Sequence, residues 1–438
     1  MLNPSCLPFA VAALTSLVAA APLLAQSAPR DADRARAERV LRSTPLVDGH
    51  NDLPWAIRES EAAPGNVAAY DLRETTSGHT DLARMRQGRL GAQFWSVYIP
   101  GEPGEAAYAR SGSVASTPGY ARAQLEQIDI ARQLIARYPS RLTLALRAAD
   151  VAPAFRAGRV ASFLGAEGGH AIENSLGTLR AYYDLGVRYM TLTHNVTLDW
   201  ADAALDDARH GGLSRFGEEV VREMNRLGML VDLSHVSPAT MSDALRVSQA
   251  PVIFSHSSAR ALANHARNVP DSILRLLPKN GGVVMVTFVP GFLSQAVIDY
   301  ERRADSAMAG LPASDTAARS AAARAWQAAN PRPDATLAQV ADHIEHVRRV
   351  AGPDHVGIGS DFDGVTSLPV GLEDVSKFPA LFAELARRGW SDADLRKLAG
   401  ENVLRALRQA EQLSVRLRRE RPASTKTIAE LDGGRTQP

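Results

Sequence analysis

Short apolar runs rich in β-branched residues alternate with amphipathic stretches from about Pro45 to Leu407. Eight runs have the character of buried strands: Leu46–Gly49, Ala92–Ile99, Val160–Gly165, Arg188–Thr193, Leu230–Ser234, Val252–Ser255, Gly282–Phe288 and Val356–Ser360. Most are followed by a loop and then by a stretch with helical periodicity, such as Gly217–Leu227 or Leu337–Val350. This alternation is typical of βα units around a parallel sheet, and eight such units predict an α/β fold of the (β/α)8 TIM-barrel type.

The repeating body is longer than the ~250 residues of a typical barrel, which predicts insertions. Two candidates are Gly101–Gln133, after the second run, and Ile298–Thr336, whose Ala- and Arg-rich sequence predicts helix. We therefore expect one barrel domain over residues 45–411 with helical insertions. Residues 412–438 are expected to form a polar C-terminal tail that is loose from Ser424 onward.

The N-terminus has the pattern of a secretory leader. Leu7–Ala25 carries no charge, and the polar stretch Gln26–Arg36 follows directly. A signal peptide over residues 1–25 is therefore expected, with export to the periplasm or the medium. An uncleaved membrane anchor is the alternative, since ~20 apolar residues can cross a bilayer and no Lys or Arg precedes the run. Pro22 and the small residues at the end of the run favour cleavage.

Composition narrows the chemistry. Hydrophobic residues make up 45% and charged residues 22% of the chain, which excludes a disordered, coiled-coil or collagen-like protein. Basic and acidic residues number 49 and 48, so no basic excess points to nucleic acid as a partner. The single cysteine, Cys6, lies in the expected leader. A metal site in the mature chain must therefore use His, Asp and Glu.

Metal-binding or titratable side chains stand where these runs end. They are His50, Asp52, Glu167, His194, His235, His256 and Asp361. The carboxyl ends of barrel strands converge on one mouth, where active sites form, and unpaired charges are costly to bury. Each residue alone has an ordinary structural explanation, but their shared position on different strands predicts a metal centre.

Spacing suggests how these residues divide between two ions. His50 and Asp52 are two positions apart, so both face the same side of a strand and can bind one ion. Glu167 has two carboxylate oxygens and can bridge, while His235 and His256 from neighbouring strands can complete a second site. Imidazole and carboxylate without thiolate favour Zn²⁺, with Mn²⁺ or Co²⁺ as alternatives. Two such ions would share a hydroxide and polarise a carbonyl group, which is the chemistry of metal-assisted hydrolysis.

The remaining histidines are expected to be structural. They are His79, His170, His210, His265, His343, His346 and His355. Asp363, two residues beyond Asp361, competes with it for a proton-transfer role. Asp361 lies nearer the strand end and is the preferred candidate.

The same segments resemble the membrane (renal) dipeptidase family. Its motifs occur in family order over nearly the whole body: LVDGHNDLPW, GAEGGHAI, YMTLTHN, LVDLSHVS, PVIFSHSSAR, ARNVPD, GGVVMVTF, GIGSDFDG and GLEDVSKFPALFAELARRGW. The resemblance implies a binuclear zinc enzyme that hydrolyses dipeptides, tolerates a D-residue at the C-terminal position and opens some β-lactams.

Position by position, the resemblance implies the following roles. His50 and Asp52 would bind the first zinc, His235 and His256 the second, and Glu167 would bridge them. His194 would contact the substrate and the tetrahedral intermediate, Arg267 would hold the C-terminal carboxylate, and Asp361 would handle protons near the amino end.

The chain differs from the family pattern in two respects, and two other functions are alternatives to a zinc dipeptidase. Phe288–Phe292 stands where family members often carry a substrate-contacting tyrosine, and the missing cysteines mean that any homodimer would be non-covalent. The C-terminal segment is not hydrophobic, so no lipid anchor of the animal type is expected. A binuclear amidohydrolase acting on a lactone, cyclic amide or ester would keep the metal ligands without needing Arg267. A non-catalytic protein on the same barrel is the second alternative, and the complete ligand set argues against it.

Overall fold

Parallel strands close into a ring in the order β2-β1-β9-β8-β7-β6-β5-β4, with β2 paired to β4. The structure is a computed structural model that describes residues 31–101, 119–312 and 316–433. The ring strands are β1 (Leu46–Asn51), β2 (Leu90–Ser96), β4 (Val160–Glu167), β5 (Val187–Thr191), β6 (Leu230–Asp232), β7 (Ile253–Phe254), β8 (Val283–Val286) and β9 (Val356–Ile358). Each overlaps one of the eight predicted runs, so the predicted barrel is confirmed.

A ninth strand, β3 (Leu142–Leu144), lies outside the ring. It pairs with the first residues of β4, Val160–Ser162, while β5 pairs with the last ones, Leu164–Glu167. The sequence pattern did not predict β3, although this strand is as long as β6 and β9 and longer than β7.

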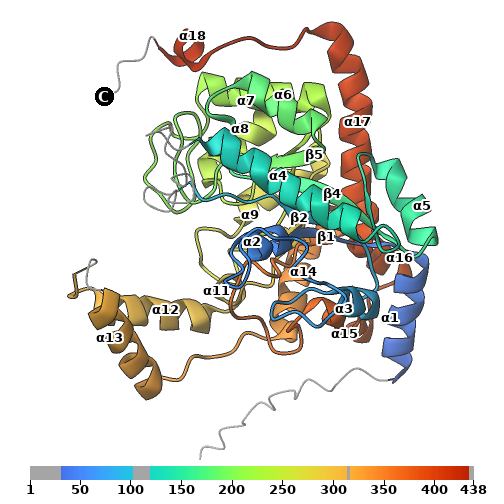
Figure 1. Ribbon diagram of the computed structural model, residues 1–438, viewed down its shortest axis with the longest axis vertical. Helices are drawn as coiled ribbons and strands as arrows, with labels where there is room; N and C mark the ends of the chain where they lie inside the picture. Colours follow the sequence, from blue (N-terminus) through green and yellow to red (C-terminus); the bar gives the residue numbers. More distant parts are fainter. Residues whose placement is uncertain (1–30, 102–118, 313–315, 434–438) are drawn as a thin grey trace, which may run out of the picture.

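Helices cover the outside of the ring (Figure 1). The main ones are α1 (Asp31–Ser43), α4 (Tyr120–Arg137), α5 (Val151–Arg156), α6 (Leu176–Asp184), α7 (Arg215–Leu227), α8 (Pro238–Val247), α14 (Leu337–Ala351), α15 (Phe378–Arg387) and α17 (Asn402–Glu420). The predicted helices α7 and α14 are both present, and local sequence explains α7. The Ser214 hydroxyl accepts a hydrogen bond from the Gly217 N–H at its start, and Gly228 ends it in a left-handed conformation.

Aromatic side chains fill the barrel interior beneath the mouth. Phe94 and Phe163 stack with ring centroids 4.7 Å apart, and Tyr189 lies 5.3 Å from Phe94. Gly165 makes this possible, because a Cβ at that position would lie 2.0 Å from Cζ of Tyr189. The Tyr189 side chain can therefore cross the interior toward β1.

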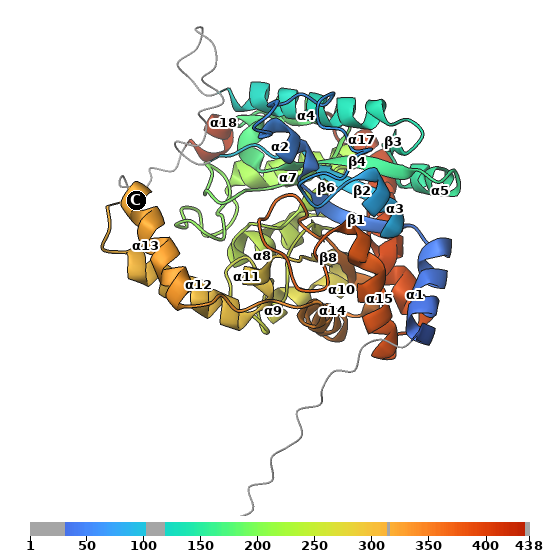
Figure 2. The ribbon, with the colours of Figure 1, turned by 60° about the horizontal axis from the view of Figure 1, so that its bottom comes forward.

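The two expected insertions differ in what the structure describes. The first contains α4, but residues 102–118 lie outside the described residues. The second forms α12 (Gln295–Met308) and α13 (Thr316–Ala329), which confirms the predicted helix. Figures 1 and 2 both show this pair projecting from the barrel, and none of the α13 side chains is buried.

The C-terminal segment is attached, contrary to the expected loose tail. Helix α17 runs through the expected boundary at residues 411 and 412 and ends at Glu420. Beyond it, α18 (Ile428–Asp432) places the Asp432 carboxylate at the start of α7. There it accepts hydrogen bonds from the Ser214 hydroxyl and from the backbone N–H groups of Arg215 and Phe216. A carboxylate at a helix N-terminus is stabilised by the unpaired N–H groups, and sequence periodicity carries no signal for this contact.

The expected leader, residues 1–25, lies outside the described residues. Within the described ranges, no helix combines the length and apolar character that crossing a membrane requires.

Candidate active site

All the sequence-predicted site residues meet at the carboxyl end of the barrel. A cavity of about 420 Å³ opens there and is lined by Asp52, Glu167, His194, His235, His256, Arg267 and Asp361, together with apolar and aromatic neighbours. His50 lies at the side of this cavity in contact with Asp52 and Glu167. The strand-end pattern therefore located one common site.

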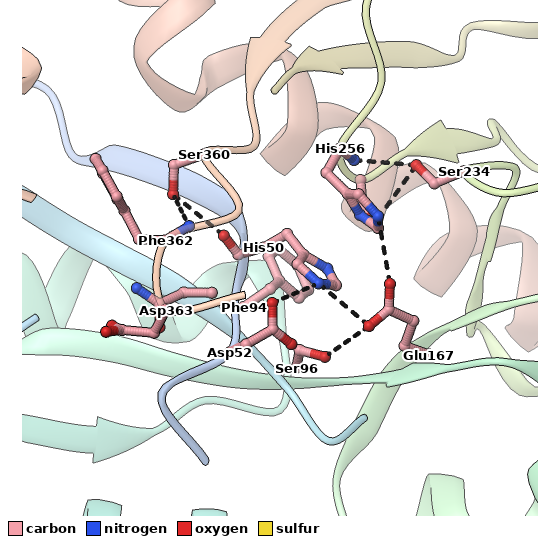
Figure 3. Close-up of polar contacts among 12 residues, drawn as sticks. His50, Asp52, Phe94, Ser96, Glu167, Ser234, His256, Ser360, Phe362 and Asp363 are labelled. Atoms are coloured by element: carbon pink, nitrogen blue, oxygen red, sulfur yellow. Dashed lines mark hydrogen bonds and ion pairs between the residues drawn. The ribbon is translucent and has the colours of Figure 1, made fainter. Parts of the chain in front are cut away.

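Glu167, the last residue of β4, lies at the centre of the cluster (Figure 3). Its Oε2 lies 3.4 Å from Nε2 of His50, and its Oε1 lies 3.0 Å from Nε2 of His235 and 3.3 Å from Nε2 of His256. The Ser96 hydroxyl donates a hydrogen bond of 3.2 Å to Oε2. Each oxygen thus faces a different set of imidazoles, as a bridging carboxylate requires.

The imidazoles of His235 and His256 present lone pairs to the same point. His235 Nδ1 lies 3.0 Å from the Asn195 amide oxygen, so Nδ1 carries the proton. His256 Nδ1 lies 2.8 Å from the Ser255 hydroxyl, which itself donates to Asp232, so this Nδ1 is also protonated. Their two Nε2 atoms therefore face each other as acceptors, 2.9 Å apart.

Electrostatics support neutral imidazoles at these two positions. Burial, followed by the nearby Arg267 and His194, holds the pKa of His235 well below 6.5. Burial and the neighbouring His50 have the same effect on the pKa of His256. Acceptor atoms with no proton between them repel one another, and a cation bound among them removes this repulsion. The donor set therefore fits a metal ion.

The second half of the cluster also favours positive charge. Nε2 of His50 lies 3.2 Å from Oδ2 of Asp52, and the Oδ1 atom of Asp52 is buried with no hydrogen-bond partner in the described part of the chain. Burial lowers the pKa of His50, but Tyr189, Glu167 and Asp52 together raise it well above 6.5. This part of the cluster thus also fits a divalent cation held by His50, Asp52 and Glu167.

Distances between possible ligand atoms allow two adjacent metal positions. Three groups each have such atoms within 4.8 Å of one another: His50, Glu167 and His256; Glu167, His194 and His235; and His50, Asp52 and Asp361. His194 and Asp361 therefore lie close enough to act beside the metal positions. The His194 ring also lies 4.9 Å from Tyr98 and 4.4 Å from His235, measured between centroids.

Asp361 is placed in the cavity and Asp363 is not. Burial raises the pKa of Asp361 to about 8, and the carboxylates of Asp52 and Glu167 add to the rise while His50 opposes it. The side chain of Asp363 points away from Glu167 (Figure 3), and its Oδ1 accepts the backbone N–H of His79. The structure thus places Asp361, and not Asp363, among the residues that line this cavity.

Arg267 is buried, with 2% of its surface exposed, and faces the same cavity. One terminal nitrogen, Nη1, has no hydrogen-bond partner among the described residues. Burial lowers the pKa of Arg267 to about 10, which still leaves it charged at neutral pH. Its guanidinium carbon lies 5.2 Å from the ring centroid of Phe292. Phe292 therefore packs against one face of the arginine side chain. Phe292 belongs to the Phe288–Phe292 segment, which differs from the family pattern.

Sequence reasoning missed the residues that support the ligands. Asp232 accepts hydrogen bonds from Thr191 and Ser255, and through Ser255 it orients His256. Tyr189 lies 2.9 Å from Nδ1 of His50. The signal for Asp232 was available, because it is a charged residue inside the apolar run Leu230–Ser234.

Histidines expected to be structural mostly bind backbone groups. His170, His210, His343 and His355 each lie within hydrogen-bond distance of a backbone carbonyl oxygen, those of Ile99, Leu198, Leu293 and Gly282 respectively. His346 pairs with Asp271 at 2.7 Å. His79 contacts Asp363, because its Nδ1 accepts the backbone N–H of Asp363 and lies 3.8 Å from Oδ1 of the same residue. The two residues are 284 positions apart, so no local sequence pattern indicated this contact.

Comparison with known proteins agrees with the geometry. Residues 34–421 match the family model for membrane dipeptidases, peptidase family M19. Dipeptidase verJ of Clonostachys rogersoniana is 42% identical over 399 residues, which cover 91% of this chain and 92% of the relative.

Two solved structures share the architecture. The probable dipeptidase PvdM from Pseudomonas aeruginosa matches with a TM-score of 0.75 and 24% identity, covering 87% of this chain and 99% of its own. A metallo peptidase from Rhodobacter sphaeroides, liganded with a phosphinate mimic of the dipeptide L-Ala-D-Ala, matches with a TM-score of 0.67 and 25% identity. That match covers 84% of this chain and 99% of the other. At 24% identity the first comparison speaks for the fold alone.

Proposed function

The chain belongs to the membrane dipeptidase family, peptidase family M19, and from this premise we propose that it is a zinc-dependent dipeptidase with two ions bridged by Glu167. The observation that carries the proposal is one cavity that combines the histidine and carboxylate cluster with a buried, incompletely paired arginine. The cluster supplies hydrolytic chemistry, and the arginine supplies recognition of a free carboxylate.

Substrate length follows from the position of Arg267. A guanidinium pairs with a carboxylate through two parallel hydrogen bonds, and Nη1 of Arg267 is free to make one of them. The cavity, at about 420 Å³, suits a small molecule whose ends lie within its walls. A dipeptide places its terminal carboxylate one residue from the scissile bond. A tripeptide places no carboxylate there and leaves the buried charge unpaired.

The metal ions, His194 and Asp361 would each contribute to a different step of peptide hydrolysis. Two bound zinc ions would polarise the peptide carbonyl and bring the pKa of water toward neutrality. His194 lines the cavity beside His235 and would donate a hydrogen bond to the oxygen that becomes negative. Bound cations beside Asp361 would lower the pKa of its carboxyl group, so Asp361 would accept a proton from water and deliver it to the leaving amine.

The configuration of the substrate is part of the proposal. The Rhodobacter sphaeroides relative binds a mimic of L-Ala-D-Ala. The proposed roles of Arg267 and Asp361 concern the carboxylate and the amine of a dipeptide, and not the side chain at its C-terminal position. We therefore include dipeptides with a C-terminal D-residue and, as a second class, β-lactams among the substrates.

A substrate panel tests the proposal directly. Purified protein is assayed on L-Xaa-L-Xaa and L-Xaa-D-Xaa dipeptides and the matching tripeptides, with zinc and after its removal by a chelator. Zinc-dependent hydrolysis restricted to dipeptides is expected. Equal hydrolysis of tripeptides, or of neutral lactones and esters with no dipeptide activity, would move the assignment to another binuclear amidohydrolase.

Elemental analysis tests the metal count separately. Protein purified without chelator should approach two zinc equivalents. Glu167→Gln should retain fewer, since it removes negative charge between two cations. Full activity with one equivalent or less would contradict the binuclear site.

A further inference from the structure

A short segment before α3 (Leu82–Gln87), residues 76–81, contacts the loop that carries Asp361. The backbone N–H of His79 donates a hydrogen bond of 2.6 Å to Oδ1 of Asp363. In return, the backbone N–H of Asp363 donates a hydrogen bond of 2.9 Å to Nδ1 of His79. We call this reciprocal pair the His79–Asp363 clasp. It joins two loops that are far apart in the sequence.

The same segment also contacts the first pair of expected metal ligands. The Thr80 hydroxyl oxygen accepts a hydrogen bond of 2.9 Å from the side-chain amide of Asn51. Asn51 lies between His50 and Asp52, at the end of β1. Residues 76–81 therefore connect the β1 end to the loop after β9 that carries Asp361.

Other contacts hold this segment in place. The Arg84 side chain donates to the Thr76 hydroxyl at 2.7 Å and to the Asp81 carboxylate at 2.5 Å. Arg84 lies on α3, so the segment is fixed to a helix on the outside of the barrel. The clasp thus joins the Asp361 loop to a braced element.

Close packing leaves little freedom on either side of the clasp. A Cβ at Gly78 would lie 2.2 Å from Oδ1 of Asp363. A Cβ at Gly364 would lie 2.3 Å from Oδ2 of Asp52 and 2.5 Å from Oδ1 of Asp361. Gly78 thus allows the two loops to approach, and Gly364 allows the Asp361 loop to lie against Asp52, so a small shift of this loop would move Asp361 relative to Asp52.

The loop has a backbone that must be held by its surroundings. Asp361 and Asp363 adopt left-handed conformations, with φ of 69° and 63°. Non-glycine residues rarely adopt this conformation, and it persists where tertiary contacts determine it. The hydrogen bond from the Asp363 N–H to His79 is one such contact, and it lies two residues from Asp361.

We propose that His79 and Asp363 are positioning residues that set the direction of the Asp361 carboxylate through the clasp. The inference deepens the proposed function and rests on it for the role of Asp361. It also assigns a purpose to Asp363, which the metal cluster does not use. Misplacement of a proton-transfer group by about 1 Å can cost ~10²-fold in rate, so the clasp is expected to affect turnover.

Two variants of His79 distinguish the loss of its hydrogen bond to Asp363 from the loss of the imidazole ring. Asn places an amide oxygen where His79 has Nδ1, so His79→Asn retains the acceptor for the Asp363 N–H, whereas His79→Ala removes it. We expect His79→Ala to lose roughly 10–100-fold in kcat with KM within about threefold and zinc content unchanged. His79→Asn should recover most of the lost kcat.

A double variant tests whether the two residues act together. Asp363→Gly keeps a residue suited to the left-handed backbone but removes the carboxylate. If the clasp acts as one unit, His79→Ala combined with Asp363→Gly should be no slower than the worse single variant. Multiplied losses in kcat would show that the two residues act independently and would contradict the clasp.

A matched histidine–aspartate pair elsewhere provides the control. His346 lies 2.7 Å from Asp271 and is buried, yet the pair lies outside the cavity. His346→Ala should lower the Tm while leaving kcat unchanged. If His79→Ala likewise lowers only the Tm, the clasp is merely structural and the proposal is wrong.

Hydrogen exchange gives a readout that needs no substrate. In zinc-loaded protein, the backbone amides of residues 361–364 should exchange faster in His79→Ala than in the wild type, and His79→Asn should restore their protection. Unchanged exchange in His79→Ala would overturn the clasp. Failure of the wild type to cleave any dipeptide would instead overturn the proposed function, and the exchange measurement would still decide the clasp.

Discussion

The hydroxyl of Tyr189 lies 2.9 Å from Nδ1 of His50, across the barrel interior from its own strand. The same hydroxyl donates to the carbonyl oxygen of Gly49 at 3.3 Å, so it accepts the Nδ1 proton of His50. Nε2 is thereby directed at Asp52 and Glu167, where the proposed metal ion would bind. One buried tyrosine thus sets the tautomer of a proposed metal ligand on β1.

Replacing Tyr189 with Phe removes this hydroxyl and keeps the ring. Because groups that orient metal-binding histidines typically contribute 10–100-fold to metal affinity, Tyr189→Phe should weaken binding of one zinc by roughly that factor. Competition with a chromogenic chelator measures the affinity.

Tyr182→Phe is the matched control. Its hydroxyl donates to the carbonyl oxygen of Ala171 at 2.7 Å and is equally buried, but this partner is a backbone group and not a histidine of the cluster. This variant should bind zinc like the wild type. Equal zinc affinity in both variants would show that the Tyr189 contact does not orient His50.

Conversion of Asp361 to Asn tests the proton-transfer assignment. An amide cannot accept a proton at neutral pH, so kcat should fall by ~10²–10⁴ while both metals remain bound. Asp363→Asn should cost much less, because its amide oxygen can still accept the backbone N–H of His79. Stopped assays of both variants on one dipeptide measure this contrast. A large loss in Asp363→Asn with a mild one in Asp361→Asn would reverse the assignment.

The barrel and the side-chain cluster at its mouth could be predicted because both depend on short-range patterns. Apolar runs mark the strands, and a residue that follows a run must lie at the mouth, so His235 and Glu167 were found without knowing the contacts. Tyr189 could not be found in this way. It lies inside a strand that is buried over its whole length, and only the closed barrel brings its hydroxyl to His50.

The same limit applies to contacts between distant segments. The clasp joins residues 284 positions apart, and Asp432 caps a helix that begins 217 positions earlier. Neither contact produces a periodic pattern in the sequence, since each consists of a few hydrogen bonds between polar groups that are far apart along the chain. Long-range polar contacts therefore had to come from the structure.

His343 is expected to make stability depend on pH. Its Nδ1 accepts the Ala259 N–H and its Nε2–H donates to the Leu293 carbonyl oxygen, each at 3.0 Å, so the buried ring is neutral. Burial lowers the pKa of His343 to about 4. The unfolded chain, with a pKa near 6.5, takes up the proton first. Stability from this residue is therefore complete above pH ~6.5, and roughly 3 kcal/mol is lost as the pH falls toward ~4.

Denaturant unfolding at several pH values measures this effect in the wild type and in His343→Gln. Metal binding also depends on pH, so the difference between the two proteins is the informative quantity. The wild type should lose more stability than the variant between pH 6.5 and 4. Parallel curves would show that His343 does not titrate in this range.

The account depends most on recognition of a free carboxylate by Arg267, and amidating a good dipeptide substrate tests this directly. Leaving one member of a buried charge pair without its partner costs roughly 2–5 kcal/mol. The wild-type kcat/KM should therefore fall by at least ~30-fold on the dipeptide amide. Arg267→Ala should be slow on the free dipeptide and nearly indifferent to amidation. A wild-type enzyme that cleaves the amide as fast as the free dipeptide would contradict the assignment as a dipeptidase.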